Sequence, residues 1–146
     1  MTKHKMENLH LLKQKVTISG KRKTAIAKAT IKEGTGKVII NNTPYQNLPS
    51  MFHRLLIKEP LEIAKNVLGD LKFDIAVTIS GGGNETQIEA ARLAIAKSIF
   101  HYTKSQELKK AYVEYDRNLL IADTRRKEPY KPGDSKARSK RQKSYR

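Results

Sequence analysis

Cysteine is absent from this sequence of 146 residues, and its absence excludes several kinds of chemistry. Without a thiol the chain cannot form a disulfide, a thiolate zinc site or a cysteine nucleophile. Long apolar runs are missing too, since none approaches the roughly 20 residues of a membrane-spanning helix. Near the start only Leu9, Leu11 and Leu12 cluster, which is too short for the core of a signal peptide. We therefore expect a cytosolic protein.

Patterns typical of catalysis or metal binding are also missing. The carboxylates form no pair that chemistry would single out, and the few histidines stand at spacings that suit no metal ion. No arrangement of serine, histidine and aspartate can be recognised. We expect neither an enzyme nor a metal or cofactor site. The histidines are His4, His10, His53 and His101.

Two glycine-containing turns resemble nucleotide-binding loops only in part. Gly20–Thr24, GKRKT, lacks the earlier glycine of a phosphate-binding loop and has Arg22 where that loop has Ser or Thr. Gly81–Asn84, GGGN, lacks the third glycine of a dinucleotide fingerprint, because position 86 is threonine. The first turn still groups three cations, which we interpret as contacts to backbone phosphates. The second is expected to let a helix start close to a strand, and its backbone N–H groups could hold an RNA phosphate.

Positive charge, by contrast, is abundant. The chain has 30 Lys and Arg residues against 14 Asp and Glu, a net charge of +16. Residues 125–146 hold ten of the basic residues, only two acidic ones, and no Val, Ile, Leu, Met or Phe. Such a segment is expected to be disordered alone and to order on a polyanion. Solubility or localisation is the ordinary alternative, but the whole chain is basic, so nucleic acid is the favoured partner.

Apolar residues that alternate with polar ones predict four strands. The clearest is FDIAVTIS, because its large apolar residues face one way and its polar or small residues the other. The turn Glu33–Gly36 lies between two of the strands, and the spacing predicts that these two form a hairpin. The strands are expected at residues 16–19, 25–32, 37–40 and 73–80.

Four helices are expected from apolar spacing and from capping residues. Ser50 is expected to cap the first, which should end before the Glu59–Pro60 step. Pro60 then suits the first turn of the second helix, which Gly69 closes. Asn84 is the expected cap of the third and longest helix, and Ser105 is expected to start the fourth. The helices are expected at residues 51–57, 61–68, 85–103 and 105–115.

This order of elements predicts an α+β fold, a two-layer α/β sandwich with helices on one face of a small, mainly antiparallel sheet. Residues 16–124 are expected to form the globular domain, and Leu119–Ala122 is its last apolar anchor. Residues 1–15 are expected to be a basic N-terminal extension, and residues 125–146 an extended basic tail that binds RNA.

Four tyrosines lie near the C-terminus. Tyr112 and Tyr115 fall on a helical stripe, so we expect them in the core. Tyr130 and Tyr145 have polar surroundings, where stacking on a base would give them a role worth about 1–3 kcal/mol.

Five stretches follow one another along the chain: GKRKTAIAKATIKEGTGKVIINN, KEPLEIAKNV, VTISGGGNETQIEAARLAIAKSI, YDRNLLIADTRRKEPYKPG and RQKSYR. In this order they resemble the universal small-subunit ribosomal protein S-nine family. They cover nearly all of residues 16–146. The segments YDRNLLIADTRR and QKSYR look like its archaeal and eukaryotic branch. Residues 1–15 lie outside the pattern.

The resemblance implies a structural protein of the small-subunit head, in the cytoplasm, that binds the 3′ major domain of the rRNA beside neighbouring head proteins. It implies the sandwich fold of the second domain of ribosomal protein S-five, with a left-handed β-α-β crossover. It also implies that the tail passes through rRNA to the peptidyl-site tRNA, where Arg146 approaches the anticodon stem-loop. Twenty-two residues span at most about 70–80 Å, enough to cross much of the head. An arginine there offers a planar fork for phosphate.

The expected contacts fall into two sets, one for each RNA. The rRNA set is Lys21, Arg22, Lys23, Arg125, Arg126, Lys127, Lys131, Lys136, Arg138, Lys140 and Arg141. The tRNA set is Lys143, Tyr145 and Arg146.

Two other functions stay open at this point. One is a basic RNA-processing protein or ribonuclease cofactor of the same fold, although a metal-dependent nuclease should show clustered Asp and Glu. The other is a free chromatin or RNA-chaperone protein, which would not sediment with small subunits.

Overall fold

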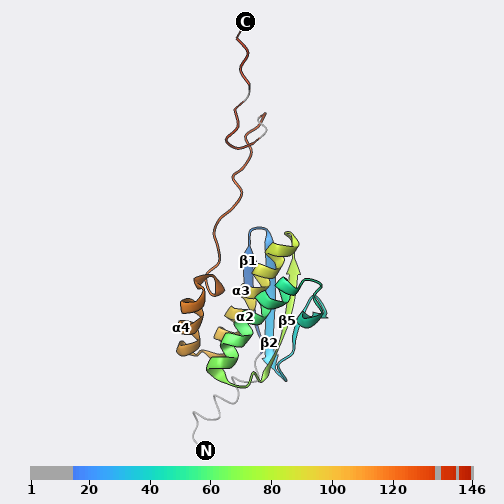
Figure 1. Ribbon diagram of the computed structural model, residues 1–146, viewed down its shortest axis with the longest axis vertical. Coiled ribbons are helices and arrows are strands. Elements are labelled where there is room, and N and C mark those ends of the chain that lie inside the picture. The colour runs from blue at the N-terminus through green and yellow to red at the C-terminus, as the bar shows by residue number, and fades with distance from the viewer. Residues whose placement is uncertain (1–14, 134–135, 141, 146) are drawn as a thin grey trace, which may run out of the picture.

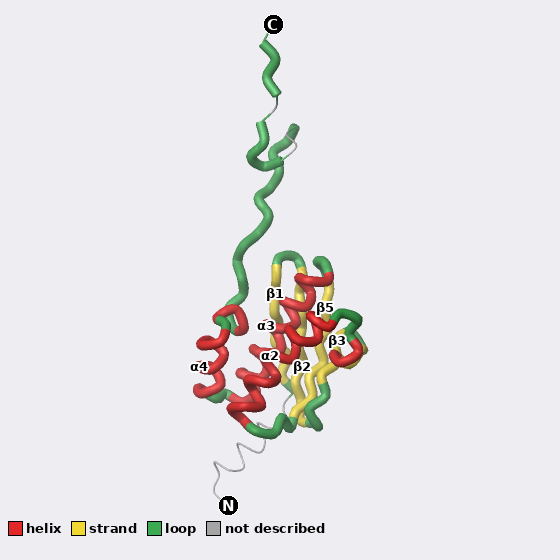
Figure 2. Tube along the Cα trace, viewed as in Figure 1, coloured by secondary structure: helices red, strands yellow, loops and turns green. Residues whose placement is uncertain are grey.

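A single five-stranded sheet, covered on one face by helices, forms the body of the protein (Figure 1, Figure 2). The computed structural model describes residues 15–133, 136–140 and 142–145. The α+β class and the mainly antiparallel sheet are as predicted. The strands are β1 (Val16–Arg22), β2 (Ala25–Glu33), β3 (Val38–Ile40), β4 (Thr43–Pro44) and β5 (Phe73–Ser80). The helical elements are η1 (Tyr45–Asn47), α2 (Met51–Leu68), α3 (Asn84–Thr103), α4 (Gln106–Tyr115) and η2 (Arg117–Leu119).

The strands lie in the order β1-β2-β5-β3-β4. β2 pairs antiparallel with β1 on one side and with β5 on the other, so that Ile31 lies opposite both Val16 and Ile75. The predicted hairpin between residues 25–32 and 37–40 is wrong, because β3 pairs in parallel with β5 instead. β5 offers β2 a partner over its length from Ile26 to Glu33, whereas β3 is only three residues long. The β2–β5 ladder is longer than a ladder between β2 and β3 could be, and it therefore buries more of the apolar residues that alternate along β2.

The first strand is longer than predicted. β1 continues through Arg22 and leaves only Lys23 and Thr24 to turn the chain, with Lys23 at φ 50°. Gly20 lies within this strand and faces α3, where a Cβ would stand 2.5 Å from the carbonyl oxygen of Ala90. The glycine therefore sets the close approach between β1 and α3.

One continuous helix, α2, replaces the two helices predicted around Pro60. A proline inside a helix removes one backbone hydrogen bond and usually bends or ends it. The predicted stop is wrong because α2 buries residues on both sides of the proline, among them Ile57 and Ala64, in one apolar face. The carbonyl oxygen of Pro60 also accepts a hydrogen bond from the hydroxyl of Tyr112 in α4, at 2.9 Å.

Helix α3 packs on β1, β2 and β5 and also contacts α2, which in turn contacts α4. Ile88, Ala91, Ile95 and Ile99 recur at three- and four-residue spacing and are all buried, which confirms the helix expected from apolar spacing. Leu93 and further alanines bury other sides of it. Asn84 is the first helical residue rather than the cap, which is a correction. The cap is Gly83, whose N–H donates to the Thr86 hydroxyl oxygen at 3.0 Å, while that hydroxyl donates back to the Gly83 carbonyl at 2.8 Å.

Helix α4 begins as predicted, with Ser105 accepting a hydrogen bond from the Leu108 amide. Tyr112 is fully buried, which confirms its place in the core, and burial raises the pKa of its hydroxyl. Tyr115 is 57% exposed, so its predicted burial is wrong. The chain turns into η2 directly after α4, and η2 puts Leu119 into the core in its place.

Within the described residues, no helix combines the length and the hydropathy that a membrane crossing requires.

Candidate nucleic-acid interface

The turn between β1 and β2 lies beside the glycine turn that starts α3. A Cβ on Gly81 would stand 2.8 Å from the carbonyl oxygen of Thr24, and one on Gly82 would stand 2.8 Å from the Cβ of Ala25. Both glycines have positive φ, at 73° and 70°, which favours glycine in this crossing. The predicted close start of a helix on a strand is therefore present. Two basic groups of the sequence, the first turn and the tail, meet at this end of the sheet.

Arg22 connects the two. Its Nε donates to the Glu89 carboxylate of α3 at 2.5 Å, and its Nη1 donates to the carboxylate of Asp123 at the start of the tail. The hydrogen bond to Glu89 raises the pKa of Arg22 most, burial opposes the shift, and Asp123 adds to it. The Arg22 side chain is only 19% exposed, and its ion pairs join β1 to α3 and to Asp123. The neighbouring Lys21 and Lys23 are exposed.

Asp123 fixes the first turn of the tail. Its Oδ1 accepts the backbone N–H of Arg125 at 2.8 Å, and its Oδ2 lies 2.7 Å from the Arg125 guanidinium. A guanidinium nitrogen of Arg126 donates to the Asp123 carbonyl oxygen at 3.2 Å. The side-chain hydrogen bond from Arg125 is the main cause that lowers the pKa of Asp123. The carboxylate thus anchors the tail while the Arg125 side chain stays 82% exposed.

A second ion-pair cluster lies next to the first. The Arg92 guanidinium is 2.7 Å from Glu59 of α2 and 2.8 Å from Asp116, directly after α4. Burial raises the pKa of Asp116, but hydrogen bonds from Arg92 and from the Asn118 amide outweigh it, so the pKa is lowered overall. The two clusters surround a polar cavity of about 290 Å³ at the root of the tail.

The tail leaves the domain beside α4 and extends past the end of the sheet at which β1 and β2 are joined (Figure 1). Its described residues form no helix or strand. Lys127 places its Nζ 4.0 Å from the centre of the Tyr130 ring, a cation–π contact. The Arg138 guanidinium lies 3.0 Å from Glu128, so the tail bends back on itself there. Tyr130 and Tyr145 are exposed, at 53% and 87%.

Most of the residues predicted to contact RNA are exposed, and the exceptions are few. Arg22 is the one whose side chain is largely buried among the predicted residues that the structure describes. Arg141 and Arg146 lie outside the described residues. The structure brings Arg22 close to Arg125 through Asp123, and it spreads the others along the tail. The exposed members are Lys21, Lys23, Arg125, Arg126, Lys127, Lys131, Lys136, Arg138, Lys140, Lys143 and Tyr145.

The role of Arg22, Glu89, Arg92, Asp116 and Asp123 as one anchoring region was missed from the sequence. Nothing in the spacing signals it, because Arg22 and Asp123 are 101 positions apart. A weak signal existed in YDRNLLIADTRR, where the two aspartates flank the last apolar anchor.

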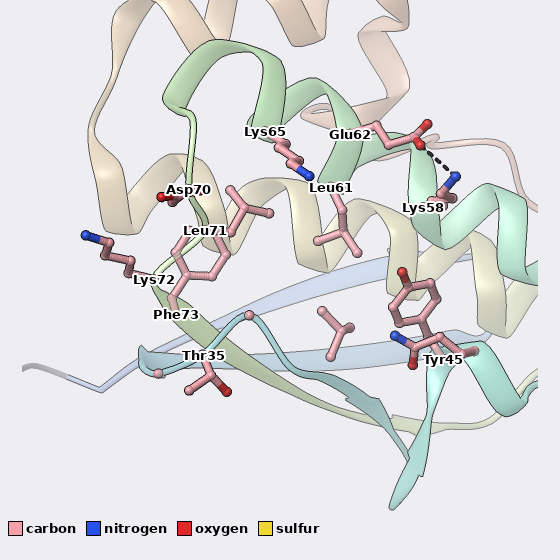
Figure 3. Close-up of a pocket in the computed structure, with 14 residues that line it drawn as sticks. Thr35, Tyr45, Lys58, Leu61, Glu62, Lys65, Asp70, Leu71, Lys72 and Phe73 are labelled. Carbon is pink, nitrogen blue, oxygen red and sulfur yellow. Dashed lines mark ion pairs between the residues drawn. The ribbon is translucent and has the colours of Figure 1, made fainter.

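A larger cavity, about 570 Å³, lies elsewhere, between α2, the turn after β2 and the start of β5 (Figure 3). Leu61, Leu71 and Phe73 supply its apolar wall. The carboxylate of Glu62 is paired with Lys58 at 2.7 Å. Nowhere in the described part of the chain do three or more His, Asp or Glu side chains converge as they would on a metal ion. The charged side chains of its lining are mostly lysines, with Glu62 and Asp70 as the carboxylates.

Comparisons with known proteins agree with one another. The family model described as "Ribosomal protein S9/S16" matches residues 20–146. "Small ribosomal subunit protein uS9" of Methanococcus vannielii is 44% identical over 129 residues, covering 87% of this chain and 95% of that protein. The protein of the same name from Methanothrix thermoacetophila is 46% identical over 131 residues, covering 90% of this chain and 98% of its own.

Proposed function

This chain belongs to the ribosomal protein S9/S16 family, structural constituents of the small ribosomal subunit, and we propose that it binds rRNA there through its first turn and its tail. The observation that carries the proposal is the exposed run of cations that begins at Arg125, on a root anchored by Asp123. Basic side chains on a chain without helix or strand can follow a phosphate backbone closely. The 3′ major domain of the rRNA and neighbouring head proteins are the proposed partners, and the ribosome in the cytoplasm is the place of action.

The proposal assigns a separate role to each of three segments of the chain. Residues 16–124 form the domain that docks, residues 125–146 the tail that passes between RNA helices, and residues 1–15 a basic extension. The parallel pairing of β3 with β5 across α2 supports a relation to the second domain of ribosomal protein S-five. Arg22 anchors the tail, so the phosphate contacts of the first turn fall to Lys21 and Lys23.

Salt dependence of binding tests the rRNA contact. If the turn and the tail neutralise about eight phosphates, log K for the 3′ major domain transcript should fall with log salt at a slope of about −6 to −7. Deleting residues 136–146 should make the slope shallower and leave docking of the domain intact. A nearly flat dependence for the intact chain would contradict the proposal.

The end of the tail is the proposed contact to the peptidyl-site tRNA, through Lys143, Tyr145 and Arg146. Deleting Arg146 alone should leave subunit assembly intact and speed tRNA dissociation several-fold, because one charge-assisted phosphate contact contributes about 1.5–3 kcal/mol at most and other contacts share the load. Arg146→Lys should be intermediate, since it keeps the charge without the fork. Dissociation of tRNA from purified subunits measures this. An unchanged rate, or failed assembly, would rule out this role.

A further inference from the structure

No described part of the chain covers the face of the sheet turned away from the helices, and its side chains are exposed or half-buried. We call it the outer face. Alternation along each strand defines it, because the helix-facing residues of β2 and β5 are those in the core. Its residues are Thr17, Ser19 and Lys21 of β1, Ile26, Lys28, Thr30 and Lys32 of β2, Ile39 of β3, and Asp74, Ala76, Thr78 and Ser80 of β5.

The charge of the outer face is positive. Its three lysines are exposed, and Asp74 is its one carboxylate. That carboxylate is already engaged, since its Oδ1 accepts the backbone N–H of Thr35 at 2.8 Å and of Lys37 at 3.0 Å. These two bonds, the one from Lys37 first, lower the pKa of Asp74. The acid therefore closes a turn, while Lys32, which lies opposite it in the register, lowers its pKa further by its charge.

Eight of the eleven described carboxylates of the domain belong to the helical layer; the other three are Asp74 of the outer face, Glu33 at the end of β2 and Asp70 in the loop before β5. The eight stand on α2, α3, α4 and the segments around them, where several pair with arginine or lysine. The domain thus separates its charges, with mixed and partly neutralised charge on the helical layer and lysine on the sheet. The eight carboxylates of the helical layer are Glu59, Glu62, Glu85, Glu89, Glu107, Glu114, Asp116 and Asp123.

The remaining side chains of the outer face are short and rich in hydroxyl groups. Lys28 lies on the middle of the three longest strands, between Ser19 and Thr78 in the register. The hydroxyls of Thr17 and Thr30 are 3.0 Å apart across β1 and β2. Short neighbours keep the surface flat, so a polymer could reach the ammonium groups and hydrogen-bond the hydroxyls. Lys21 is diagonal to Lys28 across the same pair, about 7–8 Å away at the backbone.

We propose that the outer face is a second phosphate-binding surface for RNA, separate from the tail, with Lys28 and Lys32 as its central cations. Charge complementarity favours a polyanion over a protein partner. Interfaces with proteins concentrate aromatic and apolar side chains at their centre and deplete lysine. Here the only large apolar side chains are Ile26 and Ile39, at 39% and 37% exposure. The inference rests on the proposed function only in taking rRNA as the RNA.

Matched pairs of lysine substitutions test this surface. The full chain carrying Lys28→Gln and Lys32→Gln is compared with one carrying Lys65→Gln and Lys110→Gln, which removes the same charge from exposed positions of the helical layer. The probe is the transcript of the 3′ major domain of small-subunit rRNA, titrated over a range of salt. The outer-face pair should make the log K against log salt slope shallower by about 1.4–1.8, and the helical pair should change it little. All substituted residues are exposed, so thermal melting should confirm that both variants fold.

The outcomes separate this inference from the proposed function. Equal slopes for the two variants overturn the inference, even where deletion of residues 136–146 still makes the slope shallower. If the intact chain shows a flat slope, the proposed function fails together with it. Lysine-reactive crosslinking in purified small subunits provides the second measurement. Crosslinks from Lys28 to RNA support the surface, and crosslinks to a protein alone overturn it.

Discussion

Arg92 connects three parts of the helical layer through one guanidinium, because it bonds Glu59 of α2 and Asp116 after α4 while it belongs to α3. Its side chain is only 15% exposed. Removing it would leave two partly buried carboxylates without their cation, which is more costly than the loss of a surface pair.

Arg92→Gln should therefore lower the free energy of unfolding by about 1–3 kcal/mol. The control is Lys58→Gln, which breaks the exposed pair with Glu62 and should change the free energy of unfolding far less, because solvent screens that pair. Urea denaturation followed by circular dichroism measures both. Equal losses for the two variants would mean that Arg92 contributes no more than an ordinary surface charge.

At the scale of elements, the approach of β1 to α3 depends on a missing side chain. A Cβ on Gly20 would lie 2.5 Å from the Ala90 carbonyl oxygen and 2.8 Å from the Ala94 amide nitrogen, both on backbone that cannot move aside cheaply. Gly20→Ala should therefore push β1 and α3 apart and destabilise the domain by about 1–3 kcal/mol. Ser19→Ala, one residue away and exposed, should change stability by less than about 0.5 kcal/mol. Thermal unfolding of the two variants compares them, and a neutral Gly20→Ala would refute the close-packing role.

Elements with strong local periodicity could be predicted from the sequence, and elements decided by distant partners could not. The alternation in β5 and the spacing in α3 carry their own signal, so both were found nearly to the residue. The course of α2 through Pro60 and the pairing of β3 depend on what packs against them, since burial across α2 and the longer ladder of β5 decide each case. Local rules for proline and for hairpins point the other way.

The candidate site shows the same division. The basic tail is visible in composition alone, and the exposure of its described cations agrees with that prediction. Arg22 looks like its neighbours Lys21 and Lys23 in the sequence, yet only it finds Glu89 and Asp123 in space. Which cations hold the fold and which remain available for RNA is a property of the tertiary structure.

At the scale of the whole molecule, the core ends well before the chain does. Leu119 is fully buried, and among the described residues Leu120 is the last along the chain that packs against the core cluster. Beyond it the described chain rests on the ion pairs of Asp123. The stability of the domain should therefore be almost independent of the tail.

Removal of residues 125–146 should change the free energy of unfolding by less than about 1 kcal/mol, because Asp123 keeps its pair with Arg22. Leu119→Ala should cost about 2–5 kcal/mol by comparison, since it opens a cavity in the core. Hydrogen exchange on the free protein should show the amides of residues 126–132 unprotected and those of β5 and α3 protected. Strong protection of residues 126–132 without RNA, or a large loss on truncation, would show that the tail is part of the folded domain.

The strand order also determines when the strands can pair while the chain is being synthesised. β5 is the last strand to be made, yet it stands in the middle of the sheet between β2 and β3. A ribosome that adds about 5–20 residues per second takes about 2–7 s to go from Ile40 to Phe73. During this interval one edge of the β1–β2 hairpin has no neighbour, which is when strands are prone to pair with other chains. The helix-facing side of β2 is made mostly of Ala25, Ala27 and Ala29. Before β5 is made, this strand therefore exposes little large apolar surface. The edge of β2 therefore stays unpaired until β5 has been made. An alanine-rich strand carries less risk of aggregation during this time than a valine- or isoleucine-rich strand would.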